Sequence, residues 1–299
     1  MKFLVPLALS TCALSAVILA KADRVAAQEQ ESVARFSSRV QLVEVYASVI
    51  AANGEPVMGL RRADFEVFED GRPQELSTFA AGEFPLTVAL GVDRSFSMAG
   101  EPLRLAKDAS QAFLQELKPD DRSMVVAISN EADVIAPLSA DRTSQARAIA
   151  GLDAWSTTAL HDAIIGTLDR LEPERGRQAI VMFSDGVDRY SHATAGQVMD
   201  RARRSHALIY PIALGKARAP LLAELAALTG GRSFQLRDAR ELRPTLATIA
   251  RELRYQYLLG YSPADPSDPG VHHWRSIRVT LKNPPPGVRV RARDGYTTE

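Results

Sequence analysis

The chain has 299 residues, of which 46% are hydrophobic and 24% are charged, a balance typical of a globular protein with a substantial core. Its 36 basic residues equal its 36 acidic ones, which excludes the electrostatic footprint of a protein that binds nucleic acid or an anionic membrane surface. The length suits one medium-sized domain together with a smaller one.

The first 27 residues are predicted to be a signal peptide. Lys2 precedes an apolar run from Phe3 to Ala20, and Val25 and Ala27 provide the small residues at a cleavage site. We therefore expect export to the periplasm, the cell envelope or the medium. An uncleaved membrane anchor is the alternative, because the run is just long enough to span a bilayer.

The single cysteine, Cys12, lies inside this segment, so the mature chain is expected to have no disulfide, no thiolate metal site and no cysteine nucleophile. Residues 28–38 are polar and are predicted to be a flexible segment.

Residues 39–83 are predicted to be an N-terminal β segment of three or four antiparallel strands. Valine and alanine alternate with other residues in "VEVYASVI", which indicates a strand with one buried face. Asn53-Gly54 and Asp70-Gly71 are the turn signals.

Residues 84–254 have a different character, since continuous apolar strands alternate with helical patterns. This alternation is typical of a parallel sheet that is covered on both faces. Pro211 places its strand near an edge of the sheet. The predicted strands are Leu86–Val92, Met124–Ser129, Ala179–Phe183 and Ala207–Leu214, with Val134–Leu138 as an antiparallel edge strand. Helices are predicted around Leu103–Leu117, Leu160–Leu171, Pro220–Leu228 and Leu242–Leu253, the third ended by Gly230-Gly231.

Residues 255–299 are predicted to be a C-terminal β segment, with a turn-rich stretch, "ADPSDPG", at 264–270. Each flank has only about 45 residues, too few for a comfortable independent domain. We expect both flanks to pair into one β-sandwich with the α/β domain inserted between them. Two separate β appendages are the alternative.

Polar side chains follow two of the predicted strands directly. Asp93, Ser95 and Ser97 come after the first strand, and Asp185 follows the strand "AIVMFS". Ligands of open α/β sheets bind beyond the carboxyl ends of the strands, and this all-oxygen set suits a hard cation. Thr158 opens a periodic helix, and its hydroxyl is expected at the same edge. A polar strand-to-helix turn with a serine N-cap is the alternative.

The loops "DRSFSM", "TALHDA" and "VMFSDGVD" together resemble the three loops of a von Willebrand factor A domain with a metal-ion-dependent adhesion site. The resemblance covers about residues 84–254. The flanking sequences "GLRRADFEVFEDGRPQELSTF" and "LRYQYLLGYSP", with "VRVRARDGY" later, are similar to those of exported bacterial von Willebrand factor A-related proteins of Acidobacterial type.

The resemblance implies a Rossmann-like, doubly wound, mostly parallel sheet. It also implies that Ser95, Ser97 and Thr158 offer hydroxyls to Mg²⁺ or Mn²⁺, with Asp93 and Asp185 acting directly or through water. Three neutral hydroxyls leave such an ion electron-poor, so that an acidic residue of a protein partner completes its coordination.

One residue departs from the family pattern, since Phe96 stands where related sites commonly have glycine. Its side chain must point away from the metal, where it either lines the partner surface or restricts access. Asp188 is interpreted as a loop carboxylate, with a role beside the metal as the alternative, and Asp162 as a structural acceptor for loop backbone.

An enzyme is not expected. Ser184-Asp185-Gly186 follows a strand, but the G-x-S-x-G elbow is missing, the histidines lack zinc spacing and no phosphate-binding loop occurs. Two alternatives to metal-dependent protein binding remain. One is an envelope assembly component with a vestigial metal site, whose β segments make the contacts. The other is a Mg²⁺-dependent hydrolase, which needs a general base that the sequence does not reveal.

Overall fold

The computed structural model describes residues 42–216, 219–263 and 272–298. The predicted signal peptide, the segment 28–38 and the turn-rich stretch at 264–270 lie outside the described residues. Within the described ranges, no helix is both long and apolar enough to span a membrane.

The centre of the fold is a six-stranded sheet with the order β10-β9-β8-β5-β6-β7. All neighbouring strands in it are parallel except β6 and β7, so β7 is the antiparallel edge strand that the sequence predicts. Every residue of β5 and of β8 is buried, because helices cover both faces of the sheet. The strands are β5 (Leu86–Asp93), β6 (Arg122–Ile128), β7 (Ala132–Ser139), β8 (Arg177–Ser184), β9 (Leu208–Leu214) and β10 (Phe234–Leu236).

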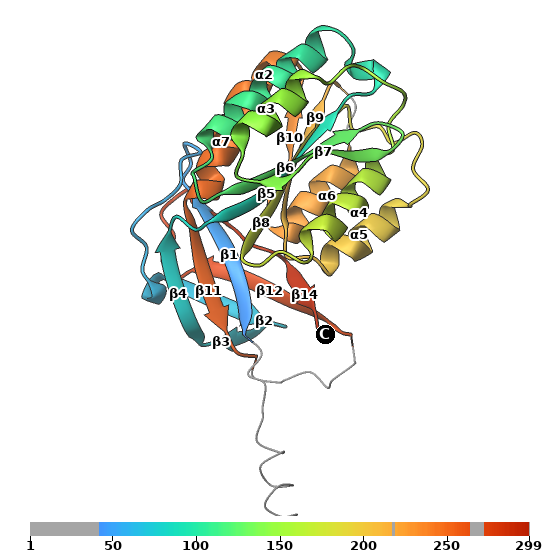
Figure 1. The fold of residues 1–299 in the computed structure, drawn as a ribbon. Coiled ribbons are helices and arrows are strands. Elements are labelled where there is room, and N and C mark those ends of the chain that lie inside the picture. Colours follow the sequence, from blue (N-terminus) through green and yellow to red (C-terminus); the bar gives the residue numbers. More distant parts are fainter. Residues whose placement is uncertain (1–41, 217–218, 264–271, 299) are drawn as a thin grey trace, which may run out of the picture. The chain divides into compact units, whose positions relative to one another are not determined.

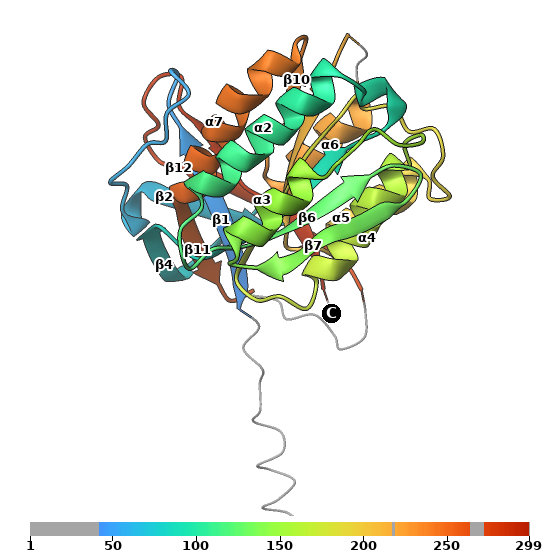
Figure 2. The same ribbon diagram turned by 45° about the horizontal axis from the view of Figure 1, so that its top comes forward.

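Six helices form the two outer layers. Helices α2, α3 and α7 cover one face of the sheet and α4, α5 and α6 cover the other (Figure 1). Figure 2 shows α2 and α7 side by side. Their bounds are α2 (Glu101–Glu116), α3 (Arg142–Ala150), α4 (Leu160–Leu171), α5 (Ala195–Arg203), α6 (Pro220–Thr229) and α7 (Leu242–Arg254), with short 3₁₀ helices η1 (Arg62–Asp64), η2 (Phe96–Met98) and η3 (Ala239–Glu241). The α/β fold class predicted from the sequence is confirmed.

Two of these helices have weak sequence signals. Helix α3 buries only Gln145 and Ile149, and α5 buries only Val198 and Ala202. Each presents only two buried side chains, too few to form an apolar stripe that periodicity reveals. Helix α6 is the opposite case: it begins at Pro220 and ends at a left-handed glycine, as its sequence predicts.

The two flanking β segments build two four-stranded sheets with one shared core. One sheet has the order β13-β1-β11-β4 and the other the order β14-β12-β2-β3. The strands are β1 (Val43–Ile50), β2 (Phe65–Glu69), β3 (Arg72–Gln74), β4 (Leu76–Gly82), β11 (Gln256–Tyr261), β12 (Trp274–Leu281), β13 (Arg289–Arg291) and β14 (Gly295–Thr297).

The N-terminal strands do not form a sheet by themselves. Strand β11 lies between β1 and β4, and β12 pairs with β2, so each sheet combines both ends of the chain. The reason is burial: alternate residues of β1 and β2 need an opposing apolar face, and strands of the C-terminal segment complete both sheets that provide it.

A buried arginine connects the α/β layer to the sandwich. Arg177, at the start of β8, donates hydrogen bonds to the carbonyl oxygens of Phe84 and Leu253 and lies 3.4 Å from Oε1 of Gln256. The amide of Gln256 in turn donates to Ser48 Oγ at 2.9 Å. Burial lowers the pKa of Arg177 to about 10, which reflects how completely its guanidinium is removed from water.

Candidate functional site

The first loop of the candidate site follows β5 and is organised by a buried carboxylate. Asp93 is 0% exposed; its Oδ1 accepts a hydrogen bond from the Ser95 backbone N–H at 2.8 Å and its Oδ2 accepts one from Ser184 Oγ at 2.6 Å. The turn that results places the Ser95 and Ser97 hydroxyl oxygens 3.0 Å apart. Ser184, whose place after a strand suggests only a candidate nucleophile, is the hydrogen-bond donor that orients Asp93, and no signal in the sequence points to this role.

The second loop carries Thr158 and runs beside the first. The Trp155 N–H donates to the Arg94 carbonyl at 2.7 Å, and the Phe96 N–H donates to the Ser156 carbonyl at 3.0 Å. These bonds hold the two loops together, and Thr158 itself is 2% exposed. The hydroxyl-bearing residues of both loops are therefore adjacent in space, although about sixty positions separate them along the chain.

The third loop follows β8 and supports the second one. The N–H groups of Arg189 and Tyr190 donate to the Thr158 carbonyl at 3.0 and 3.1 Å. Asp188 Oδ1 accepts hydrogen bonds from the N–H groups of Leu160 and His161, at 2.8 and 3.2 Å. Helix α4 has no capping side chain of its own, so Asp188 satisfies its free N–H groups from another loop.

Asp162 is the structural acceptor that the sequence predicts. Its two carboxylate oxygens accept hydrogen bonds from the N–H groups of His192 and Ala193, both at 2.9 Å. Burial acts to raise the pKa of Asp162, but these bonds outweigh it and the net effect is a lowered pKa.

The three loops enclose a hollow of about 370 Å³. Its lining consists of Ser95, Phe96, Ser97, Ser156, Thr157, Thr158 and Arg189. All three hydroxyl-bearing residues predicted as metal ligands therefore line one hollow. The two predicted carboxylates, Asp93 and Asp185, do not belong to the lining. Asp93 lies beneath Ser95 and next to Ser184, and Asp185 is held in its loop by the Val187 N–H, which donates to Asp185 Oδ1 at 3.0 Å.

The buried carboxylate sits in an environment that disfavours its charge. Burial is the main cause that raises the pKa of Asp93, hydrogen bonds from Ser184 and Ser95 act to lower it, and the charge of Asp185 raises it further. A cation between the two carboxylates and the hydroxyls would reverse this balance, because it would compensate both negative charges at once.

The donor set fits a hard divalent cation. All five predicted ligands offer oxygen, and two cis ligands of an octahedral Mg²⁺ lie about 2.9 Å apart when each is about 2.05 Å from the ion. The Ser95 and Ser97 hydroxyl oxygens, at 3.0 Å, already have that separation. No group of three or more His, Cys, Asp or Glu side chains able to hold a metal occurs in the described part of the chain.

The side chains of Phe96 and Ser184 differ in their exposure to solvent. Phe96 is 66% exposed and contributes to the lining of the hollow, so its ring lies on the surface that a partner would meet. Ser184, in contrast, is 1% exposed and its hydroxyl is engaged with Asp93. Its hydroxyl does not belong to the lining of the hollow.

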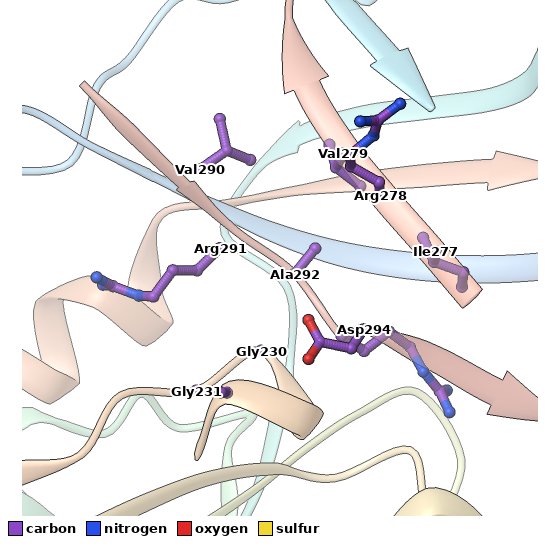
Figure 3. A pocket seen from close by; sticks show the side chains of 11 residues that line it. Gly230, Gly231, Ile277, Arg278, Val279, Val290, Arg291, Ala292 and Asp294 are labelled. Carbon is purple, nitrogen blue, oxygen red and sulfur yellow. The ribbon is translucent and has the colours of Figure 1, made fainter. Parts of the chain in front are cut away.

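A second hollow, of about 340 Å³, lies where the glycine turn after α6 meets the C-terminal strands (Figure 3). The arginine side chains at its wall extend in different directions: Arg278 lies over the Phe68 ring at 4.6 Å, and Arg291 reaches Glu252. The guanidinium groups of Arg278 and Arg291 therefore do not converge on a common point.

Comparisons with known proteins point to the same loops. Residues 88–187 match the family model described as the von Willebrand factor type A domain. Inter-alpha-trypsin inhibitor heavy chain H4 of Bos taurus is 28% identical over 127 residues, which are 38% of this chain and 13% of that protein. The same protein of Homo sapiens is 25% identical over 146 residues, 44% of this chain and 15% of its own length. This chain thus matches less than a sixth of the length of either relative.

Two solved structures share the fold. A von Willebrand factor type A protein from Catenulispora acidiphila superposes with a TM-score of 0.52 at 15% identity, over 85% of this chain and 73% of that one. Proximal thread matrix protein 1 from the mussel byssus, solved with a zinc-occupied MIDAS motif, gives a TM-score of 0.53 at 15% identity, over 62% of this chain and 49% of that one.

Proposed function

Because this chain contains a von Willebrand factor type A domain, a protein-interaction fold, we propose that it binds a divalent cation and, through the ion, a protein partner. The proposed ion is Mg²⁺ or Mn²⁺, and the partner supplies an Asp or Glu side chain. The observation that carries the proposal is that Ser95, Ser97 and Thr158 line one hollow, and that the Ser95 N–H is hydrogen-bonded to the buried Asp93.

Each residue has a distinct task in this proposal. Ser95, Ser97 and Thr158 hold the ion with neutral oxygens, while Asp93 and Asp185 act directly or through water. Ser184 fixes the orientation of Asp93 through its 2.6 Å hydrogen bond. When bound, the ion supplies a positive charge that three hydroxyls do not neutralise, and that charge attracts a carboxylate.

Binding is favoured over catalysis by the composition of the hollow. Its lining contains hydroxyls, one aromatic ring and one arginine, with no His, Asp or Glu among the residues that form it. Hydrolysis at a Mg²⁺ site needs a general base within hydrogen-bond reach of the attacking water, and this lining offers none.

Export and domain boundaries complete the proposal. The N-terminal pattern of residues 1–27 supports export to the periplasm, envelope or medium.

We assign 84–254 to the metal-binding domain, and 39–83 with 255–299 to the β-sandwich that carries it, because the sheets and cores divide along these boundaries.

Calorimetric titration of Mg²⁺ and Mn²⁺ into the purified protein tests the metal site. We expect Asp93→Ala and Thr158→Val to weaken binding at least tenfold, because each removes an oxygen that neutralises or ligates the ion. Thr248→Val is the matched control: Thr248 lies on α7 and its hydroxyl donates only to the Pro244 carbonyl. It should bind like the wild type.

Thermal unfolding gives an independent readout, since a ligand at a hundred times its dissociation constant stabilises a protein by about 2.7 kcal/mol. A wild-type protein that shows neither binding heat nor a rise in melting temperature at millimolar Mg²⁺ or Mn²⁺ would overturn the proposal. The envelope-assembly alternative, with a vestigial site, would then stand. A pulldown from an envelope fraction, repeated with a chelator, shows whether a partner depends on the ion.

A further inference from the structure

Three large aromatic side chains are exposed on the three loops of the candidate site, one on each loop. Phe96 is 66% exposed, Trp155 is 60% exposed and Tyr190 is 58% exposed. We call these three residues the aromatic rim. Elsewhere in the described ranges, the large hydrophobic side chains with comparable exposure are Leu42, Met58 and Trp274, all in the β segments.

The residues of the aromatic rim lie on the loops that form the hollow. Phe96 belongs to the lining itself. Trp155 is fixed against the first loop by its N–H bond to the Arg94 carbonyl, at 2.7 Å. Tyr190 is fixed against the second loop by its N–H bond to the Thr158 carbonyl, at 3.1 Å. The hydrogen-bonded backbone places all three aromatic residues on the loops that enclose the hydroxyls.

The charge of the hollow adds a second observation. Arg189 is part of the lining, and the lining contains no acidic side chain. A ligand with a negative charge is therefore complementary to the hollow, with apolar contacts available at its edge.

We propose that the hollow and the aromatic rim form one docking surface for an extended protein segment in which apolar residues stand two positions before and after an Asp or Glu. The carboxylate enters the hollow, and the neighbouring apolar side chains pack on the rings of Phe96, Trp155 and Tyr190. Aromatic and arginine side chains that surround a small central pocket are the usual composition of an interface hot spot. The proposal rests on the proposed function, because it names the partner chemistry of the same site.

A protein segment fits this surface better than an acidic polysaccharide does. The exposed rings of the aromatic rim gain most from apolar side chains beside the carboxylate, whereas the sugars of an acidic polysaccharide carry polar hydroxyls there. An extended peptide satisfies the surface in a simpler way, because the side chains two positions before and after the acidic residue point to the same face, each about 7 Å from it, and reach separate rings.

Selection of a random peptide library on the immobilised full-length chain in Mg²⁺, followed by fluorescence anisotropy with the selected peptides, tests this proposal. We expect the enriched peptides to carry Asp or Glu with an apolar residue within two positions. Their binding should be lost in chelator and should fall at least tenfold in Trp155→Ser and in Phe96→Ser. Met58→Ser is the matched control: Met58 is 56% exposed on the β segment, and its replacement should leave binding unchanged.

The metal affinity of each variant separates this inference from the proposed function. Trp155→Ser should bind Mg²⁺ like the wild type, because its side chain holds no ligand in place. A wild type that binds no Mg²⁺ would sink the proposed function. If the wild type binds Mg²⁺, three results would overturn the aromatic-rim proposal alone. These are that no peptide is enriched, that the enriched peptides lack the acidic-apolar pairing, or that Trp155→Ser binds them as well as the wild type does. Binding of polygalacturonate in place of peptides would also overturn it.

Discussion

Replacement of Ser184 by alanine probes the support of the metal site without touching a predicted ligand. The Ser184 hydroxyl donates to Asp93 Oδ2 at 2.6 Å and accepts from the Gly186 N–H at 3.1 Å. Ser184 is 1% exposed and Asp93 is 0% exposed, so water cannot replace the lost donor without rearrangement.

The expected loss of stability in Ser184→Ala follows from the charge of the acceptor, the Asp93 carboxylate. A buried hydrogen bond to an ionised group contributes about 1.5–3 kcal/mol, and Asp93 keeps its bond from the Ser95 N–H. We therefore expect Ser184→Ala to lower the free energy of unfolding by about 2 kcal/mol. The melting temperature of a protein of this size changes by about 2–4 °C per kcal/mol, so a loss of about 2 kcal/mol lowers it by roughly 6 °C.

The matched control is Ser110→Ala in α2. Ser110 is also 0% exposed, but its hydroxyl has no hydrogen-bond partner among the described residues. Its removal should change the free energy of unfolding by less than about 0.5 kcal/mol, or increase it. Urea unfolding of both variants and the wild type in chelator measures the difference. A Ser184→Ala variant within about 0.5 kcal/mol of Ser110→Ala would refute the idea that Ser184 stabilises the Asp93 carboxylate.

Two further predictions concern parts of the fold that support the site. Gly231→Ala should lower the free energy of unfolding by about 3 kcal/mol, because a Cβ there would overlap the Ile209 carbonyl. Gly196→Ala in α5 is the control: its Cβ meets only ordinary contacts, and the variant should be more stable by about 0.5 kcal/mol. Equal urea midpoints of the two variants would contradict this prediction. Asp162→Asn should cost about 1 kcal/mol at pH 7, since two N–H groups at 192–193 hydrogen-bond its carboxylate. Because the pKa of Asp162 is lowered in the folded state, its contribution to stability is present above its ordinary pKa of 3.8 and is lost as the pH falls through the folded-state pKa. Urea unfolding at neutral and at acid pH should therefore show a smaller difference in unfolding free energy between the wild type and the variant at acid pH.

The sequence was most informative where a local pattern has only one structural solution. The apolar runs of β5 and β8 predict buried parallel strands, and both are buried along their whole length. Pro220 and the glycine pair at 230–231 predict the bounds of α6 within one residue. Periodicity failed for α3 and α5, because each buries only two side chains and leaves almost no stripe to detect.

The supporting contacts of the candidate site were beyond the reach of the sequence. Ser184 and Asp93 are 91 positions apart, and Asp188 caps a helix 28 positions before it in the chain. Neither contact can be predicted from the separation of the residues along the sequence, because each depends on which strands become neighbours and on the conformation of the loops that follow them.

The sequence by itself determined the α/β class, the buried strands and the chemical types of the candidate ligands, because burial and turn formation act on residues that are close along the chain. Tertiary structure decided the rest. It interleaved the two β segments into two sheets, gathered Ser95, Ser97 and Thr158 at one hollow, and placed Phe96, Trp155 and Tyr190 on the loops around it. The physical reason is that a parallel sheet brings the carboxyl ends of its strands to one edge, whatever their separation along the chain.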